Sequence, residues 1–251
     1  TLGAPDLLSG DLSACPPCEA IVHAAAHISY DDADPEIART NCVGVQQMLG
    51  LAERWGTRLL LGISSIGVIG APEAYPIAED HPVAPPTAYH ASKLFSEHVL
   101  SLAGDESRPA ASLRITSPVG KGMPGGRILS VFVDRCLREQ PLTLAGRGTR
   151  RQNYVDVRDV ARAVSRWLHQ PSQGVYNVGG DGCTSNADLA RECVRVTGSG
   201  SEIIFEGTDP AEGQVWDVSS AAASAAFGYE PECTLTSAIE EVARGIAGRT
   251  D

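Results

Sequence analysis

The sequence has no run of apolar residues that reaches the roughly 18 residues a membrane-spanning helix needs, and no secretory signal peptide opens it. A disulfide framework is not indicated either, because the seven cysteines are odd in number and scattered in spacing. Internal repeats and low-complexity tracts are absent as well. These absences predict a soluble protein of a reducing, cytoplasmic compartment.

Basic residues are scarce relative to acidic ones. The chain has 20 Lys and Arg against 31 Asp and Glu, a formal net charge of −11 and a pI of about 5.0. A surface of this sign repels phosphate backbones and anionic lipid, so we expect neither nucleic acid nor membrane as a partner. A small phosphate-bearing molecule is still compatible, because backbone amides and one or two Arg can bind it locally.

A metal or redox centre has one weak candidate, the pair Cys15 and Cys18 in a Cys-Pro-Pro-Cys sequence. No second CxxC or HxxxH follows to complete a zinc site, and two prolines suit a tight turn better than the helix start of a redox motif. We interpret the pair as a structural turn and predict no metal site. A redox or metal half-site is the alternative.

Length and patterning favour one α/β domain, or a large domain with a small lobe. With 251 residues, 43% hydrophobic and 20% charged, the chain is long enough to bury a sizeable core. Buried strands alternate with helical patterns, which predicts a doubly wound parallel Rossmann-type sheet with right-handed crossovers. The expected strands are 19–25, 58–64, 111–115, 141–145, 152–157 and 175–178, and the expected helices are 35–55, 88–103, 127–138, 160–168, 187–196 and 234–246.

The regular alternation of strand and helix patterns becomes weaker after about residue 120. We therefore expect a Rossmann-type core over 1–120 and a smaller C-terminal substrate lobe over 121–251, some segments of which return to the core.

The strongest chemical signal is Tyr89 followed four residues later by Lys93 inside a predicted helix. Residues four apart share a helix face, so the phenol and the ammonium can form a pair. The cation is expected to lower the Tyr pKa toward neutrality and to make Tyr89 a general acid and base. The spacing alone is weak evidence for an active site, because a solvent-exposed helix face can contain Tyr and Lys four residues apart by chance.

The context strengthens this reading. A predicted buried strand ends at Ser64 and Ser65, and ligands of open parallel sheets bind at the carboxyl ends of strands. A hydroxyl there can bind the substrate oxygen that Tyr89 protonates. Ser, Tyr and Lys in this order resemble the catalytic set of the short-chain dehydrogenase/reductase superfamily.

Further segments resemble the extended branch of that superfamily, the nucleotide-sugar epimerases, dehydratases and reductases. They are Gly10–Leu12, Val22–Ala26, Asn41, Ser64–Gly70, Glu79–Pro82 with Pro85 and Pro86, Arg114–Gly120, Arg151–Val160, Tyr176–Gly180 and Phe227–Pro231. Each motif alone could occur by chance, whereas their occurrence in this order along nearly the whole chain is specific to the family.

The resemblance implies roles for individual residues. Ser65, Tyr89 and Lys93 would be catalytic, and Ser65, Ser117 and Arg151 would bind substrate. NAD or NADP would be the cofactor, contacted by Asp11, Leu12, Ala24, Ala25, Ala26, Asn41, Ser64, Tyr89, Lys93 and Pro118. The implied substrate is a nucleotide-activated sugar, and the implied assembly is a homodimer formed through the helices 35–55 and 88–103.

One departure from the family pattern is large. The family begins with a strand, a G-x-x-G-x-x-G turn and a helix that hold the pyrophosphate of the dinucleotide, and this sequence contains none of them. The glycine-rich segment 120–126 follows the wrong strand to replace that turn. Two accounts are open: a fragment that has lost its N-terminal part, or a natively short protein without usual dinucleotide binding.

Smaller departures bear on the substrate. Ile69 stands where the family often has Tyr, Ser117 replaces an Asn, and Gln152 falls where an Arg often grips a diphosphate, although Arg150 and Arg151 are adjacent. The sequence after Ser65 lacks the Thr-Asp-Glu run of sugar 4,6-dehydratases, which disfavours that reaction.

The alternatives are therefore a ketoreductase acting on a non-sugar or carrier-bound metabolite, and a non-redox lyase, cyclase or binding protein on a degenerate scaffold. Among the histidines, we interpret His23 and His27 as core or turn residues and His90 as a surface or cleft residue.

Overall fold

The computed structural model describes residue 8 and residues 16–248. The predicted cofactor residues Asp11 and Leu12, and Cys15 of the Cys-Pro-Pro-Cys sequence, lie outside the described residues.

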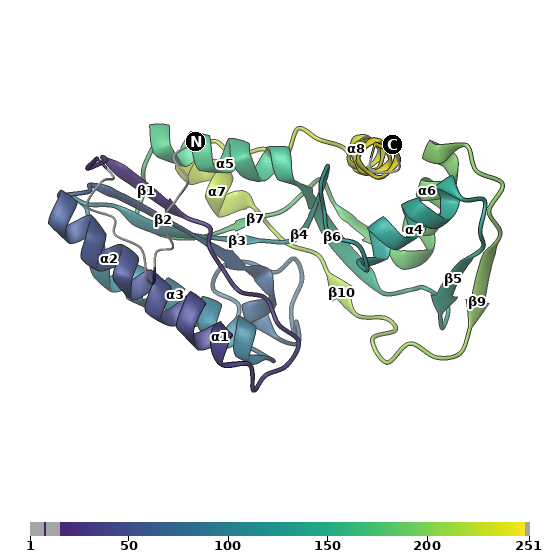
Figure 1. Cartoon of the computed structure of the whole chain (residues 1–251), viewed down its shortest axis with the longest axis horizontal. Coiled ribbons are helices and arrows are strands. Elements are labelled where there is room, and N and C mark those ends of the chain that lie inside the picture. The colour runs from purple at the N-terminus through teal and green to yellow at the C-terminus, as the bar shows by residue number, and fades with distance from the viewer. Residues whose placement is uncertain (1–7, 9–15, 249–251) are drawn as a thin grey trace.

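The core of the molecule is a parallel four-stranded sheet (Figure 1). Its strands lie in the order β1 (Ala20–His23), β2 (Leu59–Ser65), β3 (Ala110–Ile115) and β7 (Gly174–Val178). All three pairings are parallel, with Val22 beside Leu61, Leu61 beside Ala111 and Leu113 beside Tyr176. The prediction of a parallel Rossmann-type sheet is confirmed, and β7 joins this sheet from the second half of the chain.

Helices cover both faces of the sheet. One face packs against a nearly continuous helix, made of α1 (Pro35–Ile37), the π-helical segment η2 (Ala38–Val43) and α2 (Gly44–Trp55), and against α3 (Ala88–Ala103). The other face packs against α5 (Val157–His169) and α7 (Ala221–Phe227). Adjacent residues of β2 serve the two faces, since Leu60 packs with α2 and α3 while Leu61 packs with α5 and α7. This alternation is what a strand buried on both faces requires.

The second half of the chain builds a smaller body beside the sheet (Figure 1). Strand β6 (Arg151–Asp156) is parallel to β4 (Ser117–Val119) and β10 (Val215–Trp216) and antiparallel to β8 (Cys183–Ser185), and β5 (Leu142–Ala145) pairs with β9 (Ile203–Glu206). Helices α4 (Ile128–Leu137), α6 (Asn186–Thr197) and α8 (Leu235–Ala247) enclose a core of their own. Leu129, Phe132, Leu189 and Ile239 are buried there.

Helix α3 begins where the sequence dictates. Pro85 and Pro86 disfavour helix before it, and the Thr87 hydroxyl accepts a hydrogen bond from the His90 amide at 3.3 Å as an N-cap. Tyr89 therefore lies in the first turn of α3. Gly62 of β2 lets the helix approach closely, because a Cβ at that position would collide with Leu100.

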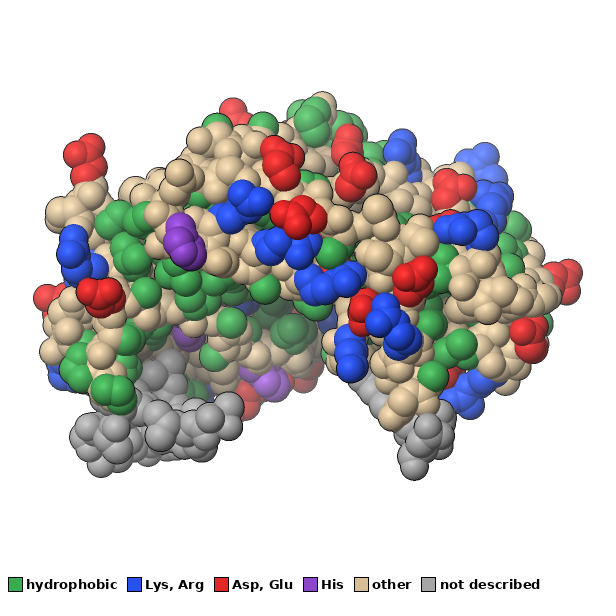
Figure 2. Space-filling model, turned by 90° about the horizontal axis from the view of Figure 1, so that it is seen from above, with side chains coloured by type: hydrophobic (Ala, Val, Ile, Leu, Met, Phe, Trp, Pro, Cys, Tyr) green, Lys and Arg blue, Asp and Glu red, His purple; other side chains and the backbone are tan. Residues whose placement is uncertain are grey.

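Charge on the outer surface is mixed. Figure 2 shows acidic and basic side chains interspersed over the face that carries α5 and α8, so no single basic patch covers the described side chains in this view. Within residues 16–248, no helix is long and apolar enough to cross a membrane.

Candidate active site

Tyr89 and Lys93 lie one helical turn apart on α3, beside the carboxyl end of β2. The Lys93 side chain is 6% exposed, and its Nζ donates a hydrogen bond to the carbonyl oxygen of Ile63 at 2.8 Å. The same nitrogen lies 5.8 Å from the centroid of the Tyr89 ring. The structure thus brings the predicted acid–base pair together on one helix face, against the strand end where ligands of such sheets bind.

The two serines at the end of β2 point to different partners. The hydroxyl of Ser64 is buried and donates to Glu97 Oε1 at 2.5 Å, so it is held inside the protein. The hydroxyl of Ser65 is half-buried, accepts from the Gly67 amide at 3.2 Å and caps the short 3-10 helix η3 (Ile66–Ile69). Ser65 keeps its own hydroxyl hydrogen available, which suits the predicted contact with a substrate oxygen.

Asn41 connects the loop after β1 to α3, the helix that carries Tyr89 and Lys93. Its Oδ1 accepts from the His27 amide at 2.7 Å, while its Nδ2 donates to the His27 carbonyl at 3.0 Å and to Ser92 Oγ at 2.9 Å. Asn41 is 2% exposed and lies in the π-helical segment η2. Irregular helical turns of this kind are frequent at functional sites because they reorient single side chains.

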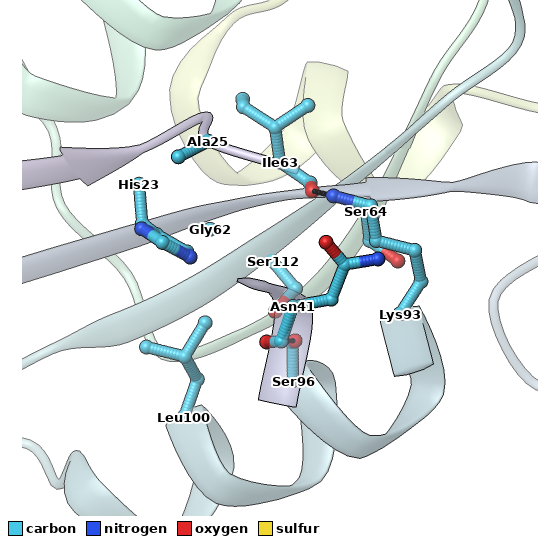
Figure 3. A pocket seen from close by; sticks show the side chains of 10 residues that line it. All are labelled: His23, Ala25, Asn41, Gly62, Ile63, Ser64, Lys93, Ser96, Leu100 and Ser112. Carbon is cyan, nitrogen blue, oxygen red and sulfur yellow. Dashed lines mark hydrogen bonds between the residues drawn. The ribbon is translucent and has the colours of Figure 1, made fainter. Parts of the chain in front are cut away.

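The small residues Ala24, Ala25 and Ala26 directly follow β1, as the sequence predicted. The loop that begins with them is fixed further on by a hydrogen bond of 2.8 Å between His27 Nε2 and the Asp34 carboxylate, and Asp34 also caps α1. His27 is therefore a turn residue, as expected. Ala25 and Asn41 line a pocket with His23, Gly62, Ile63, Ser64, Lys93, Ser96, Leu100 and Ser112 (Figure 3).

Burial dominates the electrostatics of the site. It lowers the pKa of Lys93 to about 8, and the carboxylate of Glu97 opposes this shift. The pKa of His23 falls to about 4, because the ring is buried and Lys93 lies nearby. His23 is therefore a neutral core residue at pH 7.

The expectation that Lys93 lowers the pKa of Tyr89 is wrong for this structure. Burial raises the pKa of the phenol above its usual value, and the charge that opposes the rise is Arg127 rather than Lys93.

Arg127 is a site residue that the sequence reasoning missed. It immediately precedes α4, and its guanidinium lies 5.6 Å from the centroid of the Tyr30 ring in the loop after β1. It thus brings a cation from the C-terminal lobe to the neighbourhood of Tyr89. The signal in the sequence is an Arg directly after the glycine-rich segment 120–126.

His90 fills the gap between α3 and η3. Its Nδ1 lies 2.7 Å from Thr87 Oγ1, and a side chain on Gly67 would collide with its ring. This packing makes His90 a half-buried residue of the wall beside Ser65, which agrees with the expected cleft position.

Besides Ser65, the predicted substrate residues come from β4 and β6, which belong to the smaller body beside the sheet. Ser117 is half-buried and Pro118, a predicted cofactor contact, is exposed. Arg151 is also exposed and donates to the Cys183 carbonyl at 3.0 Å.

Arg150 differs from these residues, because its Nε is buried and none of the described residues accepts its hydrogen. The indole Nε1 of Trp216, on the neighbouring β10, is likewise buried without a partner within the described part of the chain.

Metal ligands do not cluster in the part of the chain that the structure describes. No group of three or more His, Cys, Asp or Glu side chains there is placed to hold an ion.

Comparison with known protein families places most of the chain in one of them. Residues 10–179 match the NAD dependent epimerase/dehydratase family. UDP-glucuronic acid decarboxylase 1 of Xenopus tropicalis is 30% identical over 208 residues, which cover 78% of this chain and 48% of that protein. A putative UDP-glucose 4-epimerase of Methanocaldococcus jannaschii is 27% identical over 241 residues, 89% of this chain and 75% of the relative. The chain spans about half the length of the curated decarboxylases that it matches first.

Solved structures share the fold. The UDP-glucuronic acid 4-epimerase of Bacillus cereus, in complex with UDP-glucuronic acid and NAD, superposes with a TM-score of 0.85 at 22% identity, covering 97% of this chain and 80% of that one. The UDP-glucose 4-epimerase of Thermotoga maritima, with UDP-glucose, gives a TM-score of 0.84 at 22% identity over 93% of this chain and 78% of that one.

Proposed function

The chain belongs to the NAD dependent epimerase/dehydratase family, and from that premise we propose that it acts, with NAD or NADP, on a hydroxyl or keto carbon of a nucleotide-activated sugar. Tyr89 is the acid–base, Lys93 supports it and Ser65 binds the reacting oxygen. The observation that carries this proposal is the placement of Tyr89 and Lys93 on one face of α3 beside the end of β2.

The residues present suit a nicotinamide nucleoside. Lys93 uses one of its three N–H groups on the Ile63 carbonyl, which leaves two for ribose hydroxyls. Ala24, Ala25 and Ala26 offer small side chains at the end of β1, and Asn41 holds that loop in place. The described residues that would hold the cofactor are these five, together with Ser64, Tyr89 and Pro118. When bound, the cofactor supplies a hydride acceptor or donor.

The proton chemistry falls to the chain itself. Ser65 donates to the substrate oxygen, and Tyr89 gives or takes the proton of that oxygen as its carbon changes oxidation state. Because burial holds the phenol in its protonated form, Tyr89 is poised as the acid. The nearby charge of Arg127 favours the phenolate and so supports the return step as a base.

The substrate class is supported by two buried donors without partners. The Nε–H of Arg150 and the Nε1–H of Trp216 find no acceptor among residues 8 and 16–248. Unpaired buried donors are costly, and a ligand with acceptor oxygens would satisfy them. A diphosphate has such oxygens, and Arg suits phosphate particularly well. We therefore assign Arg150 to the diphosphate, beside the predicted contacts Ser117 and Arg151.

The assembly is proposed to be a homodimer through η2, α2 and α3. Val43 on η2 and Leu102 near the end of α3 are large apolar side chains that the single chain leaves exposed. Sedimentation of the purified protein at several concentrations tests this assignment.

The function is tested with the purified protein, NAD⁺ or NADP⁺, and a panel of UDP-hexoses and UDP-hexuronic acids. Proton NMR of the anomeric signals distinguishes epimerisation, oxidation and decarboxylation. We expect one of the nucleotide sugars to be converted. Conversion of free ketones or thioester-linked ketones, with no effect of UDP as a competitor, would favour the non-sugar reductase instead.

A further inference from the structure

Glu97 lies one helical turn beyond Lys93 on α3 and is as deeply buried as the lysine. The exposed fractions are 4% for Glu97 and 6% for Lys93. A carboxylate this inaccessible is strongly destabilising unless its oxygens are satisfied. The surrounding contacts show how that is achieved.

Arg114 of β3 supplies most of the compensation. Its Nε donates to Glu97 Oε1 at 3.0 Å, and its Nη2 donates to Oε2 at 2.8 Å. Ser64 Oγ donates to Oε1 from the neighbouring strand. Arg114 is 5% exposed, so this forked ion pair is almost completely removed from water.

The pair is fixed in place from several sides. Arg114 Nη1 donates to the Glu79 carbonyl at 3.3 Å, and the Glu79 carboxylate accepts from the Asn177 amide at 2.7 Å. These bonds tie β3 and β7 to the segment that runs before α3. Glu97 therefore has little freedom to move relative to Lys93.

A purely structural purpose explains this arrangement poorly. A buried ion pair is seldom more stabilising than apolar residues of the same volume. Here two cations, Lys93 and Arg114, share one anion within the core. Lys93 itself donates to Ile63 rather than to Glu97, so the carboxylate acts on the lysine through its field and not through a hydrogen bond.

Resting on the proposed function, we propose that Glu97 and Arg114 form a positioning pair that keeps Lys93 charged inside the protein while preventing it from moving away from Tyr89 into a direct ion pair. Glu97 supplies the negative field that favours the ammonium. Arg114 occupies the carboxylate oxygens, so Lys93 remains hydrogen-bonded at Ile63 and near the Tyr89 ring.

The other groups around Lys93 do not supply this field. From α3 the neighbours are the neutral phenol of Tyr89 and the imidazole of His90, whose pKa is lowered by burial. From β1 the neighbour is His23, which is neutral at pH 7. Strand β2 and segment η3 contain no titratable side chain. Segment η2 presents the amide of Asn41.

The remaining charges on the elements that contact α3 lie at the surface, as the exposed Arg54 of α2 does, or have other partners. Arg39 of η2 and Glu36 of α1 form an exposed ion pair with each other. Glu53 of α2 pairs with Arg108 at the surface. Glu97, one helical turn from Lys93 and hydrogen-bonded to the residue after Ile63, is thus the buried anion near the lysine, in agreement with the direction in which it moves the pKa of Lys93.

The composition of the chain permits a direct test. Lys93 and Lys121 are its only two lysines, and Lys121 is exposed. In a Lys121→Arg background, ¹³C-lysine labelling gives one ε-carbon signal, whose chemical shift reports the titration of Lys93. This measurement requires neither cofactor nor substrate, so its outcome is independent of whether the proposed enzymatic function is right.

Glu97→Gln keeps the size of the side chain and its hydrogen bond from Ser64 but removes the charge. We expect the titration midpoint of Lys93 to move to lower pH by on the order of one pH unit. The matched control is Glu53→Gln, which removes the charge of another Arg-paired glutamate and is expected to leave the midpoint unchanged.

A second variant guards against loss of folding. Glu97→Gln with Arg114→Gln replaces the ion pair with a neutral one, which avoids an unpaired buried arginine. In this background Lys93 has lost both its neighbouring anion and the competing cation. We expect turnover to fall by at least tenfold, because the negative charge that favours the ammonium is absent.

The titrations distinguish a positioning pair from a structural ion pair. A lower midpoint in Glu97→Gln together with unchanged titration in Glu53→Gln supports the proposal. If Glu97→Gln reduces only the melting temperature and Lys93 titrates as in the parent, or if the folded double variant retains the parent's turnover, the pair is a structural ion pair and the proposal is wrong.

Discussion

The ammonium of Lys93 lies 5.8 Å from the centre of the Tyr89 ring and is held there by a 2.8 Å hydrogen bond to the carbonyl of Ile63. The bond ties the helix that carries the tyrosine to the strand that ends in Ser65. Together with the Ser64–Glu97 hydrogen bond and the packing of Leu60 against Leu100, this contact sets the relative placement of the three proposed catalytic residues.

Arg127 is predicted to set the pH at which Tyr89 can act as a base. Its charge lowers the pKa of a phenol that burial raises. In Arg127→Gln the pKa of Tyr89 should rise further, so the ascending limb of the rate against pH should move to higher pH. Arg138→Gln, at the other end of α4, removes an exposed arginine paired with Asp134 and should leave the profile unchanged. A profile that is identical for Arg127→Gln and the parent would contradict the assignment.

Lys93 is predicted to lower the free energy of unfolding although turnover requires it. Its pKa of about 8 in the folded protein lies below the usual 10.5 of a lysine, so the unfolded chain binds more protons between these two values. Stability should therefore rise with pH across that window and be lowest below about pH 8.

Lys93→Met should accordingly be more stable than the parent at pH 7, by on the order of 1–3 kcal/mol, while losing turnover. The gain should shrink as the pH is raised from 8 toward 10.5. Urea unfolding at pH 7 and pH 9.5 measures both effects. A variant that is less stable than the parent at pH 7 would show that burial of the ammonium is well compensated.

His23 is predicted to make the protein sensitive to acid. Its pKa of about 4 lies below the usual 6.5, so protons bind to the unfolded chain first as the pH falls. Stability should decline from pH 6.5 toward pH 4 by on the order of 2–3 kcal/mol through this group. His23→Gln should lose less over the same interval, whereas His98→Gln, at an exposed position of α3, should behave like the parent. Equal acid losses in all three proteins would contradict the prediction.

Arg150 is predicted to contribute more to nucleotide binding than its neighbours. Its Nε is buried without a partner, whereas Arg151 donates to the Cys183 carbonyl and Arg147 pairs with Glu212 at the surface. Arg150→Gln should weaken UDP binding by about tenfold or more, which corresponds to about 1.4 kcal/mol. Calorimetric titration with UDP compares it with Arg151→Gln and with the control Arg147→Gln. If all three bind UDP alike, the diphosphate is held elsewhere.

Long periodic elements could be predicted from the sequence because their patterns are local. The helix at residues 88–103 is found with those bounds, and the helix expected at 187–196 is found as Asn186–Thr197. The central strands shift by a residue or so, from 58–64 to Leu59–Ser65 and from 111–115 to Ala110–Ile115.

The short strands of the lobe were not predicted. Strands β4, β8 and β10 have two or three residues each and owe their conformation to pairing with β6. Such strands have no periodicity of their own, because a pattern of alternation needs about four residues. The helix α7 is short and rich in alanine, which gives it little amphipathic signal.

In the candidate site, too, local features could be predicted and features that depend on tertiary structure could not. The pairing of Tyr89 with Lys93 follows from helix geometry and could be predicted. The contribution of Arg127 could not, because the proximity of residues 89 and 127 depends on how the lobe packs beside the sheet. The direction of the pKa of Tyr89 was also missed, since burial of a side chain is a property of the tertiary structure.

The central claim is that Tyr89 moves the proton in a nicotinamide-dependent reaction of a nucleotide sugar. The most direct measurement is the rate of conversion of the UDP-sugar by the parent protein and by Tyr89→Phe, with NAD⁺ present and with folding checked by circular dichroism. We expect Tyr89→Phe to bind UDP like the parent and to convert the sugar about 10²- to 10⁴-fold more slowly. Conversion at the parent's rate by the folded variant would contradict the account.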